Sequence, residues 1–262
     1  MTAFSSNVDI TLDEPVDLPT DYIEKHRFLS SKDRLIHILF RNVKVFSTIV
    51  PKGIFNPYKG VAAHKLIELV LTNDVQVENK RIVDLGCGSG VIGLACIHQG
   101  ARSVLFTDIN PAVTKISDHP YLRVSDQVKV QNLLDQEKDA SFDIIVVSTP
   151  TNVIPNNKSI DFHSYEGSIF RTDQFLYDLI AESARCLVPG GLLAMWVKLP
   201  TLAPFSSKKV FPNNELPMEL ARYFELKTMK IFWHALESEV DVGKQEDTAE
   251  RSHLVFAVQK TS

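Results

Sequence analysis

Three glycines and two carboxylates lie close together in the chain and could jointly hold a ligand. The stretch VDLGCGSG (83–90) ends an apolar, strand-like run, and a helix-like run follows from Val91. Glycines at such a turn let a ligand approach the backbone, and N–H groups at the start of the helix stay available to it. Asp108 ends the next strand-like run, 22 positions after Gly86, where a carboxylate can accept hydrogen bonds from ribose hydroxyls. The pattern predicts a nucleoside site, with a tight turn that binds nothing as the alternative.

The charge beside this loop separates two classes of cofactor. A dinucleotide loop has the form G-x-G-x-x-G, but the third glycine is replaced by Val91. Asp84 stands two residues before the first glycine, where its charge would oppose a pyrophosphate. The same charge would attract a cofactor that carries an ammonium and a sulfonium. The loop therefore favours S-adenosylmethionine over NAD.

A second polar cluster follows another apolar run. SFDIIVVSTPTN (141–152) begins as a buried strand and ends in small polar residues around Pro150. If the strand belongs to a parallel sheet, these residues lie at its carboxyl edge, where open α/β folds bind ligands. SIDFHSYEGS (159–168) follows at the expected mouth of the pocket and offers His163 and Glu166 as proton acceptors. A loop histidine and a solvated or helix-capping glutamate are the structural alternatives.

The elements that must position these residues alternate along the chain. Strands are predicted at 81–85, 103–107, 127–131, 142–148 and 191–197. Helices are predicted at 60–73, 91–99, 111–117 and 170–187. Such alternation indicates βαβ units, and the runs 223–236 and 252–260 suit an antiparallel pair at one edge. We therefore predict an α/β fold: a Rossmann-like, mostly parallel, seven-stranded sheet with helices on both faces and an antiparallel C-terminal edge pair.

The first 50 residues have a different pattern. They begin as an acidic stretch with Pro15 and Pro19, which predicts an extended lead-in. From about Ser31, SKDRLIHILFRNV has apolar residues at helical spacing, so a helix is predicted there. We expect 1–50 to be a small helical and extended segment that acts as a lid, a substrate-recognition element or the arm of a homodimer. Residues 51–262 would then form the cofactor-binding domain.

Composition narrows the class of protein. The chain has 262 residues, of which 44% are hydrophobic, enough for one large α/β domain. A net charge of −4 without a basic run makes a nucleic-acid partner less expected. Three cysteines without zinc spacing indicate reduced thiols, no metal site and a cytoplasmic protein. We see no signal peptide and no apolar run of about 20 residues, so no membrane association is expected.

Three motifs resemble those of the class I S-adenosylmethionine-dependent methyltransferases: VDLGCGSGVIGL, FTDINP and LVPGGLLAMWV. The resemblance covers roughly residues 50–198. It implies a Rossmann-like fold and S-adenosyl-L-methionine as cofactor. It places the ribose at Asp108, the adenine against Ile109 and the adenine amine near Asn132. The remaining cofactor contacts that we expect are Asp84, Gly86, Cys87, Gly88, Gly90 and Ser148.

One branch of that class is most similar, the "small-domain" and release-factor glutamine methyltransferases. This branch carries Asn-Pro-Pro-Tyr after the fourth strand, where two carbonyls accept hydrogen bonds from the attacking nitrogen and the aromatic ring stacks on its planar group. Here Ser148-Thr149-Pro150-Thr151 occupies that register, and the aromatic ring is absent. An aliphatic amine, a guanidine or a hydroxyl therefore suits this loop better than a planar amide or base.

The predicted function is N-methylation, or O-methylation, of a small molecule or a peptide side chain. The alternatives are methylation of an RNA base or a protein glutamine, and a non-catalytic module that binds the cofactor. The predicted catalytic residues are Ser148, Thr149, Pro150, His163 and Glu166. The predicted substrate-binding residues are Phe55, Tyr58, Asn152 and Tyr165. For Phe55 and Tyr58, packing in the interior is an equal alternative.

Overall fold

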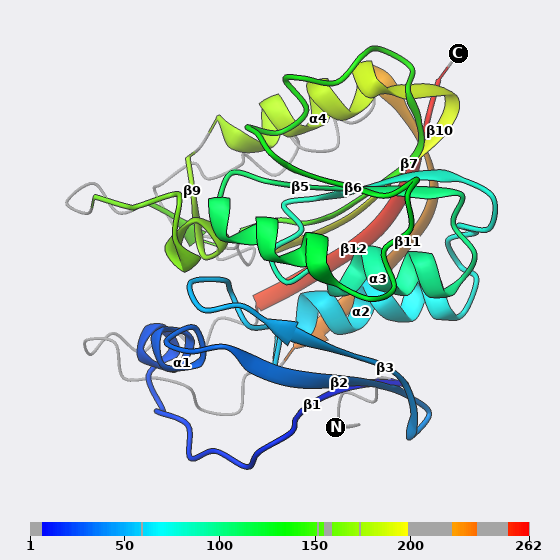
Figure 1. Cartoon of the computed structure of the whole chain (residues 1–262). Helices are drawn as coiled ribbons and strands as arrows, with labels where there is room; N and C mark the ends of the chain where they lie inside the picture. Colours follow the sequence, from blue (N-terminus) through cyan, green and yellow to red (C-terminus); the bar gives the residue numbers. More distant parts are fainter. Residues whose placement is uncertain are drawn as a thin grey trace.

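The computed structural model describes residues 7–58, 60–150, 152–154, 159–172, 174–198, 222–234 and 251–261. These residues form a large sheet of seven strands, a small sheet of three and a pair of very short strands (Figure 1). The large sheet carries the pocket, and the other elements support this sheet.

The main sheet has the strand order β11–β12–β10–β7–β4–β5–β6. Its strands are β4 (Arg81–Leu85), β5 (Ser103–Asp108), β6 (Gln127–Val130), β7 (Phe142–Ser148), β10 (Leu187–Lys198), β11 (Phe224–His234) and β12 (Arg251–Lys260). The strands from β6 to β10 pair in parallel, and β12 is antiparallel to both β10 and β11. The predicted seven-stranded sheet with an antiparallel C-terminal pair is confirmed.

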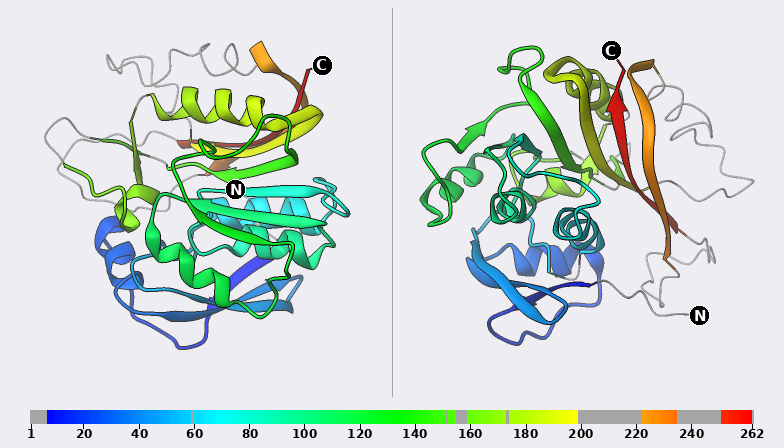
Figure 2. Two further views of the ribbon diagram at one scale, coloured as in Figure 1. Left: turned by 45° about the horizontal axis from the view of Figure 1, so that its top comes forward. Right: turned by 90° about the vertical axis from the view of Figure 1, so that its right-hand side faces the viewer.

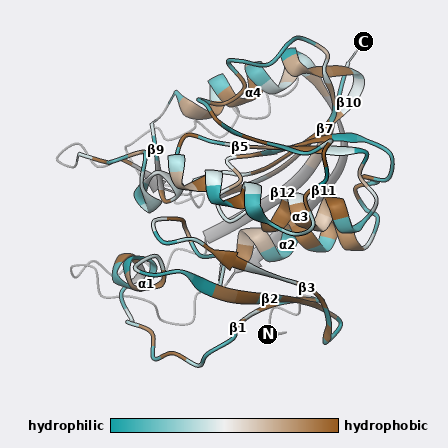
Figure 3. Cartoon of the chain, viewed as in Figure 1, coloured by the Kyte–Doolittle hydropathy of each residue, from teal (hydrophilic) through white to brown (hydrophobic). Residues whose placement is uncertain are grey.

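Helices cover both faces of this sheet because neighbouring strand residues point to opposite sides. Ile82 of β4 shares a buried cluster with Leu66 and Leu94, and the next residue, Val83, shares another with Leu179. These partners lie on α2 (Val61–Leu71), α3 (Val91–His98) and α4 (Phe175–Cys186), respectively. Figure 2 shows α2 and α3 between the two sheets, and Figure 3 shows how apolar both helices are.

The N-terminal segment is a small antiparallel sheet with one helix, α1 (Tyr22–Leu29). Its strands are β1 (Val8–Leu12), β2 (Arg34–Phe40) and β3 (Val43–Val50). The helix predicted from about Ser31 is therefore wrong. In β2, Leu35 is exposed while Ile36 and Ile38 are buried, which is the period of a strand. Arg41 and Asn42 both have positive φ, 50° and 64°, as a two-residue hairpin turn requires.

The small sheet shares its hydrophobic core with the main domain. Ile10 and Ile36 belong to the same buried cluster as Leu66 of α2. A polar contact adds to this packing, since both the backbone and the side-chain nitrogen of Asn7 donate to Glu68 Oε1, at 3.1 and 2.9 Å. The described part of the N-terminal segment, residues 7–50, is thus packed against α2.

Two predicted helices differ from the structure near the pocket. The segment predicted as helical at 111–117 is the 3-10 helix η1 (Pro111–Asp118). The helix predicted at 170–187 begins only at Phe175, because β9 (Phe170–Arg171) pairs in parallel with β8 (Asn152–Val153). A second 3-10 helix, η2 (Tyr165–Ser168), precedes β9.

The three cysteines are free and buried. Burial raises the pKa of the Cys87 and Cys96 thiols, so both are protonated at neutral pH and poorly reactive. None of the helices in the described ranges combines the length and hydropathy that crossing a bilayer requires.

Candidate active site

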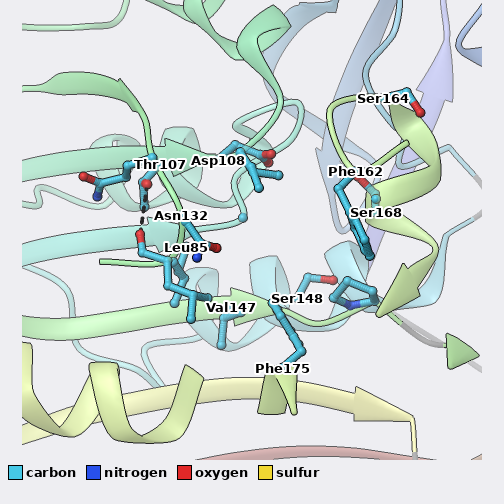
Figure 4. A pocket seen from close by; sticks show the side chains of 16 residues that line it. Leu85, Thr107, Asp108, Asn132, Val147, Ser148, Phe162, Ser164, Ser168 and Phe175 are labelled. Atoms are coloured by element: carbon cyan, nitrogen blue, oxygen red, sulfur yellow. Dashed lines mark hydrogen bonds between the residues drawn. The ribbon is translucent and has the colours of Figure 1, made fainter. Parts of the chain in front are cut away.

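A pocket opens at the carboxyl edge of the main sheet, as expected for a parallel α/β sheet. The space between its lining residues, together with the open solvent at its mouth, is about 620 Å³. Figure 4 shows its wall formed by the ends of β4, β5 and β7, the segment after β6, and the 162–175 region. The lining residues are Leu85, Gly86, Thr107, Asp108, Ile109, Gln131, Asn132, Leu133, Val147, Ser148, Pro150, Phe162, Ser164, Gly167, Ser168 and Phe175.

The glycine loop turns the chain from β4 into α3 beside this pocket. Gly86, Gly88 and Gly90 all have left-handed φ, between 50° and 73°. At Gly86, a Cβ atom would meet nothing within 4 Å, so the backbone at the pocket wall is open to a ligand. The side chain of Ile54 lies over Gly88, 4.0 Å from where a Cβ would stand. Cys87, Gly88 and Gly90 shape the loop without lining the pocket.

Asp108 ends β5 and is the charged residue of the lining. Its Oδ2 accepts a hydrogen bond from the backbone nitrogen of Gly88, and its Oδ1 from that of Asn110, each at 2.9 Å. Burial raises the pKa of its carboxyl, although the carboxyl still faces the pocket. Each carboxylate oxygen has two acceptor positions, so Asp108 can accept further hydrogen bonds from a ligand.

Asp84, predicted to contact the cofactor, is not brought to the pocket. Its residue is 1% exposed, and its Oδ2 accepts from the backbone nitrogen of Gly93 at 2.8 Å. Burial raises the pKa of Asp84 to about 8. The carboxyl therefore lies beneath the loop and ties β4 to the first turn of α3. A Cβ at Gly93 would come within 2.3 Å of the Phe106 ring, so a glycine is needed for this close packing.

The segment after β7 is only partly as predicted. Ser148 and Pro150 line the pocket. Thr149 does not, because it is 3% exposed and its hydroxyl donates to the carbonyl oxygen of Trp196 in β10 at 2.8 Å. The catalytic role predicted for Thr149 rests on its backbone carbonyl, and the structure does not place Thr149 among the residues that line the pocket. Thr151 and the side chain of Asn152 lie outside the described residues.

Two aromatic residues that sequence analysis missed, Phe162 and Phe175, line the pocket together with Ser164 and Ser168. Figure 4 shows Phe175 beside Ser148, and Phe162 on the opposite wall. Sequence analysis considered the residues between them in the chain, including His163. Residues 162–164 form a turn and a bend and Tyr165 begins η2, so no periodic pattern in the sequence indicated that Phe162 and Ser164 would line the pocket.

The other predicted residues surround the pocket without lining it. His163 is exposed, and its Nδ1 lies 3.0 Å from the carbonyl oxygen of Ile109. The backbone nitrogen of Glu166 donates to the Ser164 hydroxyl. Tyr165 is hydrogen-bonded to Arg27 of α1. Phe55 stacks on His26, also of α1, with ring centroids 4.3 Å apart.

Tyr58 lies in the same region as Phe55. Its backbone nitrogen donates to Asn56 Oδ1 at 2.9 Å, in a local turn before α2. Phe55 therefore packs against α1 of the N-terminal segment, which is the alternative that the sequence left open, while Tyr58 belongs to a local turn and does not line the pocket.

Comparison with known protein families matches residues 53–225 to the family described as "Methyltransferase small domain". The matched region contains every residue that lines the pocket. The chain belongs to this family. The cofactor that its sequence motifs imply is S-adenosyl-L-methionine. The lining fits that cofactor, because Asp108 has acceptor positions to spare and the backbone at Gly86 is open.

Individual relatives cover only part of this methyltransferase. A "Putative protein N5-glutamine methyltransferase" of Methanocaldococcus jannaschii is 28% identical over 127 residues, which are 42% of this chain and 60% of the relative. A "Ribosomal protein L11 methyltransferase" of Aeromonas hydrophila is 32% identical over 93 residues, 34% of this chain and 32% of the relative. The chain thus spans less than two thirds of either relative.

A solved structure has a fold similar to that of this chain. A "putative S-adenosylmethionine dependent methyltransferase" from Listeria monocytogenes superposes with a TM-score of 0.51 at 12% identity. The match covers 78% of this chain and 100% of that one. At that identity the match supports the fold alone.

Proposed function

We propose that the methyltransferase seats its cofactor along the carboxyl edges of β4, β5 and β6. Asp108 accepts the ribose hydroxyls, the backbone at Gly86 borders the methionine end, and Ile109 packs on the adenine. Support comes from the lining of the pocket and from the acceptor positions that remain on Asp108. On this proposal, the methyl group points toward Ser148 and Pro150 at the end of β7.

The acceptor that we propose is an uncharged nitrogen, or oxygen, on a small molecule or a peptide side chain. The observation that carries this is the composition of the acceptor side of the lining, where Phe162, Phe175, Ser148, Ser164 and Ser168 are all uncharged. Among the described residues that line the pocket, Asp108 is the sole charged one, and it belongs to the cofactor. A guanidinium or ammonium would lose its hydration here without gaining an opposite charge. The guanidine favoured by the sequence alone is therefore the weaker choice.

The residues around the methyl position need to do little covalent chemistry. S-adenosylmethionine supplies an electrophilic methyl group, so alignment of the acceptor is the main contribution of the protein. The Ser148 hydroxyl can accept a hydrogen bond from an N–H of the acceptor and so turn the nitrogen lone pair toward the methyl. The bound cofactor would supply the methyl group and leave as S-adenosylhomocysteine, and the acceptor nitrogen would release a proton.

His163 is the residue that we propose to receive that proton through water, because it lies next to Phe162 and Ser164 in the chain but does not line the pocket itself. Its Nδ1 faces the carbonyl oxygen of Ile109, which can only accept, so Nδ1 carries the hydrogen. In the neutral ring, Nε2 then keeps a lone pair that can take a proton. Glu166 is the alternative proton acceptor, and like His163 it does not line the pocket, so water would have to carry the proton to either residue.

A planar amide of a protein side chain is the second candidate acceptor. Phe162 and Phe175 offer the aromatic surface that Thr151 does not, so the loss of the family's aromatic residue need not exclude a planar group. The name of the M. jannaschii relative, an N5-glutamine methyltransferase, points in the same direction. An RNA base is the third candidate, and the net charge of −4 weighs against it.

The test begins with calorimetric titration of S-adenosylhomocysteine and continues with transfer of a tritiated methyl group. Extracts would be separated into metabolites, protein and RNA before incubation. Label in metabolites or in protein supports the proposal, and amide hydrolysis of labelled protein identifies a glutamine product. Label in RNA alone would overturn the choice of acceptor. Binding of the cofactor product without labelling of any fraction would favour a non-catalytic module.

A further inference from the structure

Three polar side chains of the small N-terminal sheet are joined by hydrogen bonds in a row. The hydroxyl oxygen of Ser47 lies 2.7 Å from His37 Nδ1, and Nε2 of the same ring lies 3.2 Å from Asp13 Oδ1. A hydroxyl beside an imidazole that a carboxylate orients is the arrangement that activates nucleophilic serines on unrelated folds. The residues that line the pocket of the main sheet do not include these three, so they form a separate group.

Backbone pairing between the strands brings the three groups together. His37 of β2 pairs with Ser47 of β3 on one side and with Thr11 of β1 on the other. Asp13 directly follows β1, and its backbone nitrogen donates to the carbonyl oxygen of Leu35 at 3.1 Å. Residues that are directly opposite in an antiparallel pair share one face of the sheet. The sheet itself therefore holds the hydroxyl, the ring and the carboxylate in place.

The partners of the His37 ring decide which of its nitrogens carries the hydrogen. A carboxylate can only accept a hydrogen bond, so in the neutral ring Nε2 carries the hydrogen and donates it to Asp13. Nδ1 then keeps a lone pair, and the Ser47 hydroxyl donates to it. In this tautomer the ring can take the hydroxyl proton when Ser47 attacks an electrophile.

The face of the sheet that carries these groups is open to solvent. Ile36 and Ile38 are buried on the face toward α2, so His37 between them points to the opposite face. Figure 2 shows α2 and α3 on the inner side of the small sheet, between it and the main sheet. The side chains of His37 and Asp13 are 22% and 55% exposed. A small molecule can thus reach the group without entering the pocket.

An apolar pair lies beside the group on the same face. Leu35 and Ile49 pair directly across β2 and β3, two positions along each strand from His37 and Ser47. They are 38% and 59% exposed. An uncharged ester with a short apolar chain suits this surface, because the chain can cover the pair while the carbonyl carbon meets the hydroxyl.

We propose that Ser47 is a second nucleophile of this chain, one that takes the acyl group of an apolar carboxylic ester, with His37 as its base and Asp13 as a positioning residue. The Ser47 oxygen forms a bond to the carbonyl carbon while its proton moves to His37 Nδ1. The bond between that carbon and the alcohol oxygen breaks, and His37 gives the proton to the leaving alcohol. Water then attacks the acyl-serine, His37 passes a proton of the water to the Ser47 oxygen, and a carboxylic acid leaves. The net reaction converts an ester and water into an acid and an alcohol, and it is independent of methyl transfer.

The test incubates the full chain with p-nitrophenyl butyrate at pH 8, quenches it with acid during turnover and locates the butyryl group by mass spectrometry of peptides. Ser47 should carry the group. His37→Gln should slow acylation of Ser47 on the order of 100-fold, because the base is lost. Ser31→Ala is the matched control, since the Ser31 hydroxyl donates to the carbonyl oxygen of Phe28 at 2.7 Å and has no base beside it. Its rate should equal that of the wild type.

Asp13→Asn tests the positioning role of the carboxylate. The new amide can donate its own N–H to Nε2, which moves the ring hydrogen to Nδ1 and leaves the Ser47 hydroxyl without an acceptor. Acylation of Ser47 should fall at least about tenfold. Asp9→Asn removes the same charge from an exposed residue of β1 and should leave the rate unchanged.

The apolar pair is tested by the length of the acyl chain. Butyrate differs from acetate by two CH₂ groups, which gain part of the free energy of burial on Leu35 and Ile49. The ratio of the rates with p-nitrophenyl butyrate and p-nitrophenyl acetate should fall about threefold in Ile49→Ser. An unchanged ratio would overturn the choice of an apolar acyl group.

Other outcomes overturn the nucleophile itself. Butyryl groups on lysines or on other histidines, with Ser47 unmodified, would do so, and so would equal acylation in the wild type and in His37→Gln. If the three side chains only tie the strands together, Ser47 takes no label while Ser47→Ala lowers the melting temperature. If His37→Gln does not fold, the position of the label in the wild type and the rate of Asp13→Asn decide the question, because the Asp13 side chain is more than half exposed.

Discussion

The two halves of the pocket are built from different kinds of chain. The cofactor half (85–86, 107–109 and 131–133) lies directly at the ends of parallel strands, and backbone hydrogen bonds from Gly88 and Asn110 hold its carboxylate. The acceptor half (148, 150, 162–168 and 175) comes largely from the connection between β7 and α4. The described part of that connection has two-residue strands and the four-residue η2. Regular backbone pairing thus fixes the cofactor half, while side-chain packing and local turns shape the acceptor half.

The largest expected effect is on the pH dependence of stability, and it comes from Asp84, the buried carboxyl beneath the cofactor half. Asp84→Asn replaces a buried carboxyl whose pKa is raised to about 8 with a neutral side chain of the same shape. Because the folded-state pKa is above that of the unfolded chain, the wild-type protein loses stability as pH rises from about 4 to about 8. The loss is at most about 1.4 kcal/mol per pH unit. The variant should therefore gain stability relative to the wild type as pH rises, measured by urea unfolding at pH 5, 6, 7 and 8.

Asp143→Asn is the matched control. Arg81, 3.0 Å away, holds the pKa of the Asp143 carboxyl below its usual range, so that carboxyl is ionised throughout pH 5 to 8. Its variant should differ from the wild type by a constant amount over this range. An Asp84→Asn difference that is equally constant would mean that Asp84 is already ionised in the folded protein.

Two glycine substitutions compare the halves directly. Gly93→Ala would bring a methyl group within 2.3 Å of the buried Phe106 ring, so the free energy of unfolding should fall by about 1–3 kcal/mol. Gly167→Ala would meet the backbone carbonyl of Phe162 at 2.4 Å. This contact lies in a short surface connection, which should shift locally, so methyl transfer should fall more than the melting temperature. If Gly93→Ala and Gly167→Ala lost equal amounts of stability, the cofactor half would not be more rigid than the acceptor half.

The difference between regular strand ends and an irregular connection also explains which residues of the pocket could be predicted from the sequence. Strand periodicity and the glycine loop sufficed for the main sheet and for Asp108, because backbone geometry at strand ends restricts the residue types there. The position of Asp84 was read from its charge, but which side of the turn it faces depends on the packing of Gly93 on Phe106. Phe162 was missed because it lies in an irregular connection, and Phe175 because it is the first residue of α4, a helix that the sequence placed from residue 170 onward. In β2, helical and strand spacing coincide, and only the hairpin turn at Arg41 and Asn42 decides between them.

An intermediate effect is expected at the carboxylate of the cofactor half. Asp108→Ala should weaken binding of S-adenosylhomocysteine by about 1–3 kcal/mol, because the ribose hydroxyls and the two backbone donors lose their acceptor. Calorimetry measures this directly. Ser148→Ala, in the acceptor half, serves as the comparison and should leave that affinity nearly unchanged. An unaltered affinity in Asp108→Ala would refute the ribose assignment.

The smallest expected effect concerns the aromatic rings of the acceptor half. Phe162→Leu and Phe175→Leu keep an apolar side chain but remove the flat ring, so an acceptor with a planar group should lose about 0.5–1.5 kcal/mol of transition-state stabilisation. That loss appears in kcat/KM for methyl transfer, while the affinity for S-adenosylhomocysteine should stay the same. If the rings only exclude water, the leucine variants should retain full kcat/KM, and the acceptor would then be a non-planar amine or hydroxyl. A parallel fall in cofactor affinity would mean that the two halves are coupled rather than separate.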